Sequence, residues 1–141
     1  MSEAIFSEGE HRVLVSGPVG QIEVALSVPS GAASGFAIVC HPHPLMGGTM
    51  DNKVVTTLAR VCRDAGLIAI RFNFRGVAAS AGSFDQGIGE QSDVLALAQW
   101  AQTQFALPWR VLAGFSFGSY VSAQVLAGLT ANGVRSDIAV Q

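Results

Sequence analysis

The strongest constraint on the fold is an alternation of apolar runs and helical segments that occurs three times after residue 36. The three runs are rich in apolar residues, as buried strands are, and they cover residues 36–40, 67–74 and 109–114. Each run precedes a segment with apolar residues at helical spacing, at about residues 52–66, 90–105 and 117–129. This order predicts a mostly parallel sheet with right-handed crossovers and helices on both faces.

The segments before residue 36 predict a different local arrangement. Residues 11–15 and 22–28 alternate polar and apolar side chains, and the turn residues 16–20 separate them. We therefore expect an antiparallel hairpin at the N-terminal side of an α/β fold. Further along the chain, Asp51 is expected to cap the helix that begins near Asn52.

The composition limits the class of protein. The 141 residues fit a single domain, 1–141, and the 13% of charged residues, against roughly 25% in an ordinary soluble domain, exclude a disordered chain. A net charge of −2 without a basic cluster argues against a nucleic-acid partner. The apolar runs are shorter than the roughly 18–20 residues that span a membrane, and no signal peptide is recognisable. We therefore expect a cytoplasmic protein in which Cys40 and Cys62 stay reduced.

A G-x-S-x-G pattern occupies residues 114–118, at the junction of a predicted strand and a predicted helix. The pattern is short, but this position is the one a nucleophile elbow requires. On such a strained turn the hydroxyl of Ser116 would stand out over the sheet edge. The helix that begins at Phe117 would offer a free N–H and a positive dipole end to an oxyanion. The alternative is a plain strand-to-helix turn with a capping serine.

The loop at residues 40–44, with the sequence CHPHP, allows three interpretations. Cys40, His41 and His43 are metal-ligand types, although their spacing suits a metal poorly. The loop could also be a passive turn, or it could supply the second oxyanion donor of a serine hydrolase. The two prolines have no N–H, so the candidate amides are those of His43 and Leu45, and we favour His43. Neither histidine is expected to be the general base, which has to approach the serine from the other side.

Three stretches together resemble the α/β-hydrolase superfamily. They read HPHPLMGGTMDNKVV (41–55), RFNFRGVAASAGSFDQGIGE (71–90) and AGFSFGSYVSA (113–123). The chain is most similar to small lidless bacterial hydrolases with an HPHP loop, near the dienelactone-hydrolase and peptidase-like branches. The resemblance implies a serine nucleophile at Ser116 and an oxyanion hole formed by the amides of Phe117 and His43. It also implies that Arg75 and Gly76 form a turn that anchors the following loop.

The activity implied is hydrolysis of an ester, or less readily an amide, of a small acyl substrate through an acyl-enzyme on Ser116. Neither a cofactor nor a metal is implied, and a homo-oligomer is compatible with the sequence. Leu45 and Asp85 lie where they could touch the edge of the substrate. Glu90 and Asp93 are interpreted as residues of a helix start, where their charge favours the helix dipole.

The resemblance breaks down after Ser116. The family places an acid and then a histidine after the serine, but the 25 residues that follow Ser116 hold Asp137 and no histidine. We therefore expect the N-terminal two-thirds of an α/β-hydrolase domain, with the last strands and helices missing and the acid and histidine beyond residue 141. Two alternatives stay open. The chain could be a non-catalytic remnant or binding protein, or a second polypeptide could complete it.

Overall fold

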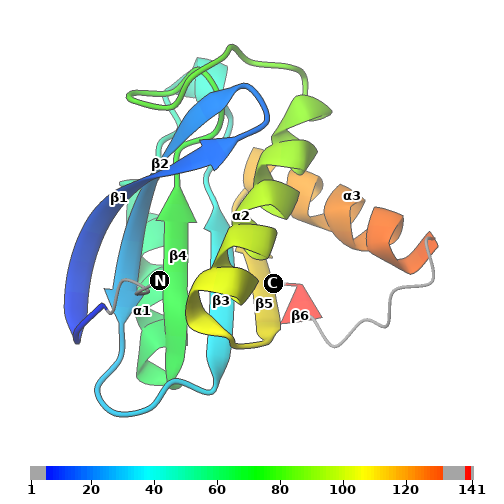
Figure 1. The fold of residues 1–141 in the computed structure, drawn as a ribbon. Helices are drawn as coiled ribbons and strands as arrows, with labels where there is room; N and C mark the ends of the chain where they lie inside the picture. The colour runs from blue at the N-terminus through cyan, green and yellow to red at the C-terminus, as the bar shows by residue number, and fades with distance from the viewer. Residues whose placement is uncertain (1–5, 132–138, 141) are drawn as a thin grey trace.

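A six-stranded sheet of order β1-β2-β4-β3-β5-β6 forms the centre of the described part of the protein (Figure 1). The structure is a computed structural model, and it describes residues 6–131 and 139–140. The strands are β1 (Gly9–Gly17), β2 (Gly20–Val28), β3 (Gly35–Cys40), β4 (Leu67–Phe72), β5 (Trp109–Gly114) and β6 (Ala139–Val140). The helices are α1 (Lys53–Asp64), α2 (Gly89–Phe105), α3 (Phe117–Ala131) and the short 3-10 helix η1 (Pro44–Met46).

The pairing of the strands confirms the predicted mixed sheet. Strands β1 and β2 form an antiparallel hairpin, and β2 also runs antiparallel to β4. Strand β3 is parallel to β4 and β5, and β5 is parallel to β6. Gly17 pairs with Gly20, so the turn of the hairpin is tighter than the five residues predicted. Asp137, the acid noted in the sequence, lies outside the described residues.

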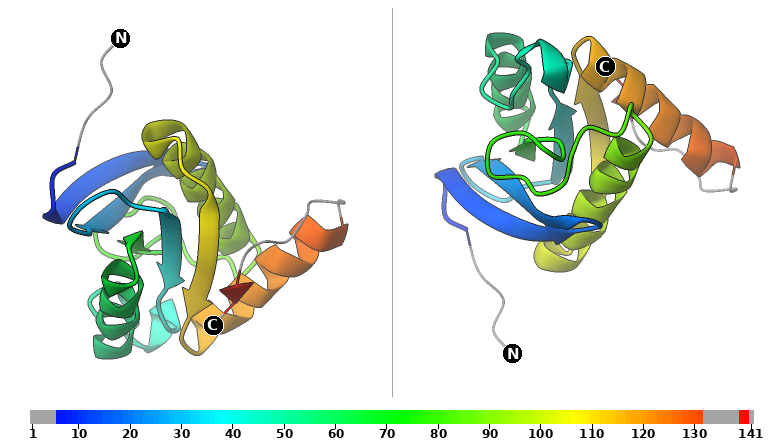
Figure 2. Two further views of the ribbon diagram at one scale, coloured as in Figure 1. Left: turned by 90° about the horizontal axis from the view of Figure 1, so that it is seen from below. Right: turned by 90° about the horizontal axis from the view of Figure 1, so that it is seen from above.

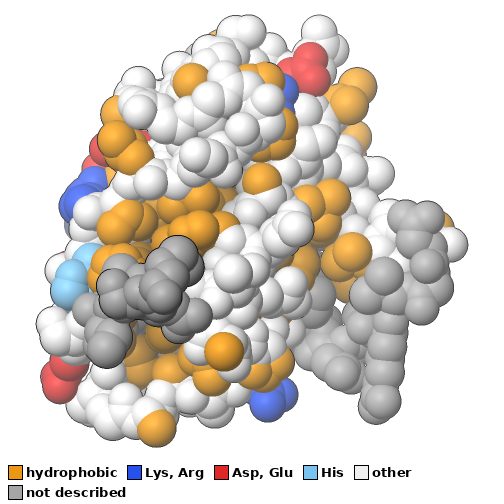
Figure 3. Space-filling model, in the orientation of Figure 1, with side chains coloured by type: hydrophobic (Ala, Val, Ile, Leu, Met, Phe, Trp, Pro, Cys, Tyr) orange, Lys and Arg blue, Asp and Glu red, His pale blue; other side chains and the backbone are white. Residues whose placement is uncertain are grey.

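Helices cover both faces of the sheet, as the alternating pattern predicts. Figure 2 shows α1 on one side and α2 and α3 on the other. The α1 side holds a small core that includes Val55 and Ala59, whereas the larger core lies under α2 and α3 and includes Leu97 and Val121. Strands β3 and β4 are buried along their whole length, which explains their apolar sequences. In Figure 3, hydrophobic side chains gather in the middle of one face and charged ones lie mostly near its margins.

Two local predictions need correction. Asn52, not Asp51, caps α1, because its side-chain oxygen accepts hydrogen bonds from the amides of Val54 and Val55. Asp51 instead forms an ion pair with Arg71 at 3.2 Å. Strand β4 ends at Phe72, two residues earlier than predicted.

A buried ion pair holds the long connection between β4 and α2. The guanidinium of Arg75 donates to both oxygens of Asp93, at 3.1 and 2.8 Å, and to the carbonyl of Gly89 at 2.7 Å. These hydrogen bonds raise the pKa of Arg75 and oppose the rise that burial causes in the pKa of Asp93. The carboxylate of Asp93 faces Arg75, and Glu90 is the acidic residue of the first turn of α2, so the dipole role of Asp93 stays a prediction. The anchoring role of the Arg75–Gly76 turn agrees with these contacts.

The end of the same connection is shaped by Glu90. This side chain is fully buried, and its two oxygens accept hydrogen bonds from the amides of Asp85, at 2.8 Å, and Gly87, at 2.9 Å. The carboxylate of Asp85 in turn accepts a hydrogen bond from the amide of Gly89 at 2.9 Å. Glu90 thus lies in the first turn of α2, as expected, and also fixes the loop that precedes it.

We expect Asp93→Asn to destabilise the protein by about 3–5 kcal/mol, because it leaves the Arg75 charge buried without its counterion. Asp64→Asn is the matched control. Asp64 pairs with Arg63 but its side chain is 65% exposed, so its loss should cost about 1 kcal/mol or less. Urea unfolding of the two variants measures both free energies. Equal losses would show that the buried pair does not hold the fold.

Candidate active site

Three loops meet at the edge of the sheet where the parallel strands β3, β4 and β5 end. They follow these strands at residues 41–52, 73–88 and 115–116. The right-hand view of Figure 2 looks onto this edge, which is where parallel sheets place ligands. All the residues that the sequence singles out for catalysis lie in or next to these loops.

Ser116 lies on a strained turn between β5 and α3. Its φ of 58° is in the left-handed region, which costs a residue other than glycine about 1–3 kcal/mol. The residue is exposed, whereas the strand just before it is mostly buried. The turn therefore holds Ser116 out over the sheet edge, in the conformation of a nucleophile elbow.

The glycines on either side of Ser116 allow three backbone segments to meet. A Cβ atom on Gly114 would lie 2.4 Å from the backbone of Gly118. A Cβ atom on Gly118 would lie 2.2 Å from the carbonyl oxygen of Cys40 and 2.6 Å from that of His41. The amide of Phe115 also donates to the carbonyl of Cys40 at 3.2 Å. The elbow is therefore packed directly against the loop that begins at the end of β3.

The backbone amides of Phe117 and His43 lie at this junction without a hydrogen-bond partner among the described residues. At the start of α3, Gly118 and Ser119 donate to the carbonyls of Phe115 and Ser116, which leaves the amide of Phe117. In the other loop, the amide of Leu45 donates to the ring nitrogen Nδ1 of His43 at 3.1 Å, which leaves the amide of His43.

The two residues with these unpaired amides also meet through their side chains. The rings of His43 and Phe117 lie 4.8 Å apart between centroids. The structure thus brings together the three predicted residues Ser116, Phe117 and His43. Leu45 lies beside His43 as well, but its amide is engaged by the His43 ring.

His41 is part of the fold rather than of the exposed site. Its Nε2 accepts the amide of Phe74 at 3.0 Å and its Nδ1 donates to the carbonyl of Pro42 at 2.7 Å. Burial lowers the pKa of His41 to about 4, so it is neutral at pH 7. Both ring nitrogens are occupied, and burial raises the pKa of the Cys40 thiol to about 12. The metal interpretation of this loop therefore gains no support from its geometry.

A pocket of about 460 Å³ lies between the loops that follow β3 and β4. Its lining includes Leu45, whose side chain is 69% exposed, together with Val77 and Phe84. Phe84 is a residue that sequence reasoning missed. Its ring lies 4.9 Å from that of His43 and 5.8 Å from that of Phe117, so it forms a wall next to the unpaired amides.

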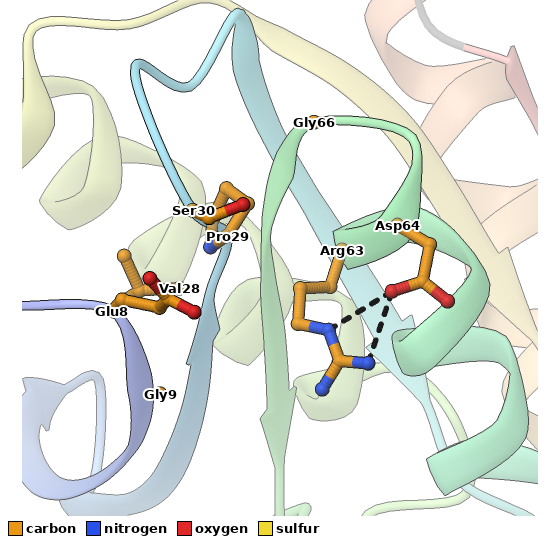
Figure 4. A pocket seen from close by; sticks show the side chains of 8 residues that line it. All are labelled: Glu8, Gly9, Val28, Pro29, Ser30, Arg63, Asp64 and Gly66. Carbon is orange, nitrogen blue, oxygen red and sulfur yellow. Dashed lines mark hydrogen bonds and ion pairs between the residues drawn. The ribbon is translucent and has the colours of Figure 1, made fainter.

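A larger pocket lies elsewhere, at the opposite edge of the sheet (Figure 4). Its volume is about 620 Å³, and its lining includes Glu8, Ser30, Arg63 and Asp64. Those side chains belong to the ends of strands and of α1 that are remote from Ser116. The smaller pocket beside His43 is therefore the better candidate for substrate.

The mixed sheet, the glycine-flanked strained serine and the neighbouring loop with its unpaired amide agree with known serine hydrolases. The lidless α/β serine hydrolase XC6422 of Xanthomonas campestris is 45% identical and superposes with a TM-score of 0.81 over 90% of this chain. An α/β serine hydrolase homologue from Coxiella burnetii is 34% identical, with a TM-score of 0.80. That match covers 97% of this chain and 89% of the Coxiella chain. The chain therefore belongs to the α/β serine hydrolase family.

Other comparisons define how much of a relative this chain represents. The uncharacterised protein RP471 of Rickettsia prowazekii (strain Madrid E) is 37% identical over 116 residues, which are 82% of this chain. The chain spans 49% of that protein and 60% of the Xanthomonas protein. No protein-family profile matches the sequence. Among the described residues, no helix is long and apolar enough to cross a membrane.

We expect Gly118→Ala to destabilise the protein by about 3 kcal/mol or more, because its Cβ atom has no room against the Cys40 carbonyl. Gly128→Ala is the matched control in the same helix, with no atom within 4 Å of the added Cβ. There the substitution should stabilise by about 0.5–1 kcal/mol, since alanine favours a helix interior. Urea denaturation followed by circular dichroism checks both. The packing argument fails if Gly118→Ala unfolds at the same midpoint as Gly128→Ala.

Proposed function

We propose that this chain carries the nucleophile and the oxyanion hole of a serine hydrolase that acts on esters of small acyl groups. Ser116 is the nucleophile, and the amides of Phe117 and His43 bind the oxyanion. The observation that carries this proposal is the exposed, left-handed Ser116 beside the two unpaired amides. Backbone amides that are already in place stabilise developing negative charge without reorganising.

The proposed reaction follows from these positions. The Oγ of Ser116 attacks the carbonyl carbon of the ester and gives its proton to a base, and the carbonyl oxygen becomes an oxyanion held by the two amides. The C–O bond to the alcohol then breaks, and the alcohol leaves with that proton. Water attacks the acyl-enzyme in the same way and releases the acid, which restores the Ser116 hydroxyl. No cofactor is needed for this chemistry.

The base is proposed to come from outside the 141 residues. All three histidines precede Ser116 in the sequence, and both ring nitrogens of His41 are already bonded within the fold. The family relatives that extend well beyond the matched region are compatible with an acid and a histidine supplied there. Removing the histidine of a triad lowers the rate by several orders of magnitude.

The proposed substrate places an uncharged group in the pocket between the loops that follow β3 and β4, which Phe84 connects to the rings of His43 and Phe117. The pocket between the two loops is lined by Leu45, Val77, Phe84 and other uncharged residues. Its one charged lining residue, Arg75, is paired with Asp93. A charged acyl or alcohol group would find no free counterion in this pocket. The role of Asp85 at the substrate edge stays a prediction. Its carboxylate accepts a hydrogen bond from the Gly89 amide.

The rival proposal is a non-catalytic protein that keeps the fold for binding. It is favoured by one observation, namely that no histidine follows Ser116 in the 141 residues, while His41 has both ring nitrogens bonded within the fold. The two proposals differ in the reactivity of the Ser116 hydroxyl, because only an activated serine reacts quickly with a phosphonylating reagent.

Intact-mass spectrometry after treatment with a fluorophosphonate tests the proposal. We expect the product of the natural gene to gain one adduct, which Ser116→Ala abolishes and the matched control Ser119→Ala retains. The 141-residue chain alone should react slower by about three orders of magnitude or more, since no histidine follows Ser116 in it.

Three results would contradict the proposal. An adduct that survives in Ser116→Ala would assign the nucleophile elsewhere. A natural gene product that never reacts would favour the non-catalytic protein. A 141-residue chain that reacts as fast as the natural product would place the base within these residues.

A further inference from the structure

A second, charged pocket lies beside α1, away from Ser116. Its volume is about 140 Å³, and its lining residues are Glu10, Ser27, Thr56, Arg60, Arg63 and Arg71. Three of the eight basic residues of the chain thus line one small pocket. The esterase chemistry proposed above uses none of them.

The sequence places these residues together for local reasons. Thr56, Arg60 and Arg63 follow one another at four and three residues along α1, so they share one face of that helix. Helix α1 packs against β3 and β4, and this face borders the adjoining hairpin of β1 and β2. Glu10 and Ser27 are directly opposite each other in that hairpin. The pocket therefore lies between α1 and the hairpin of β1 and β2.

Arg71 provides a fixed charge in the wall of this pocket. The residue is 7% exposed, and its Nη1 donates to the Met50 carbonyl at 2.8 Å and to Asp51 at 3.2 Å. Its Nη2 has a weaker partner, Glu10, at 3.5 Å. The guanidinium is thus held in place through one nitrogen, while the other has capacity for a closer acceptor.

The two arginines of α1, Arg60 and Arg63, have further N–H groups available to a ligand. Arg60 is exposed, and its side chain makes no hydrogen bond or ion pair with a described residue. Arg63 donates to Asp64 through Nε and Nη2, and Figure 4 shows its third nitrogen directed away from that carboxylate. The only acidic side chain in the lining is Glu10, which also accepts a hydrogen bond from Ser27. Outside the lining, Asp51 pairs with Arg71 and Asp64 pairs with Arg63, so what the three arginines offer a ligand is N–H donors that these carboxylates leave open.

We propose that this pocket binds a dianionic phosphoryl group, as free phosphate or as the head of a phosphate monoester. Guanidinium groups present forked N–H donors that match phosphate oxygens, and three residues that line this pocket carry such donors not fully used within the fold. The volume equals that of about four or five liquid waters, which suits a tetrahedral oxyanion and is too small for a bulky ester group. The remainder of a monoester would therefore lie outside the pocket.

Isothermal titration of the 141-residue protein with inorganic phosphate at constant ionic strength tests the proposal. We expect saturable binding that Arg60→Gln weakens by about tenfold or more, since a charge-assisted hydrogen-bonded pair is lost. Lys53→Gln is the matched control, because it removes one exposed positive charge from the same helix outside the pocket. Glu10→Gln should tighten binding, because it removes the competing carboxylate.

Two further measurements identify the ligand and can overturn the proposal. A parallel titration with glycerol 3-phosphate distinguishes a phosphate monoester from free phosphate. Tighter binding of the monoester assigns an esterified ligand, and equal or weaker binding assigns free phosphate. The proposal is wrong if phosphate gives no saturable heat beyond a chloride control. It is also wrong if Lys53→Gln weakens binding as much as Arg60→Gln, since this would indicate only diffuse surface charge.

Discussion

The close contact between Gly118 and the carbonyl groups of Cys40 and His41 is the constraint on which the site depends. This contact is possible only because residue 118 has no Cβ atom, and it packs the start of α3 directly against the end of β3. That contact forces the sharp turn at Ser116 and brings the amide of Phe117 near the loop that carries the amide of His43. A steric relation between two backbone segments thus determines where a nucleophile and its oxyanion donors can meet.

Buried polar groups then fix the loops around this contact. His41 accepts the amide of Phe74, and Arg75 pairs with Asp93 across 18 positions of sequence. Each group costs free energy to bury and is therefore tied to a specific partner, so each restricts the loop to one conformation. The strained Ser116 can persist because its surroundings are held in this way. The pocket beside α1 stands apart from this arrangement, with guanidinium donors that the fold uses only in part.

The sequence predicts the layers and the elbow well, because both depend on local patterns. The period of apolar residues marks the strands and helices, and G-x-S-x-G at a strand end specifies a turn whose steric demands are local.

Contacts between residues distant in the sequence could not be predicted from such local patterns. The carboxylate of Asp93 could not be assigned to Arg75 without the fold, and Phe84 gave no periodic signal. Asn52 is the cap because α1 begins at Lys53, one residue later than predicted, and Asp51 pairs with Arg71 instead. The prolines excluded two amides near His43, but only the structure shows that the amide of Leu45 is engaged.

The measurement that tests the account most directly is a crystal structure of the natural protein after phosphonylation. The phosphonyl group imitates the tetrahedral intermediate, so its oxygen reports where an oxyanion would lie. The account predicts a bond to the Oγ of Ser116 and an oxygen within about 2.7–3.1 Å of the amide nitrogens of both Phe117 and His43. A phosphonyl oxygen turned to solvent, or held by other donors while these two amides stay unpaired, would contradict it.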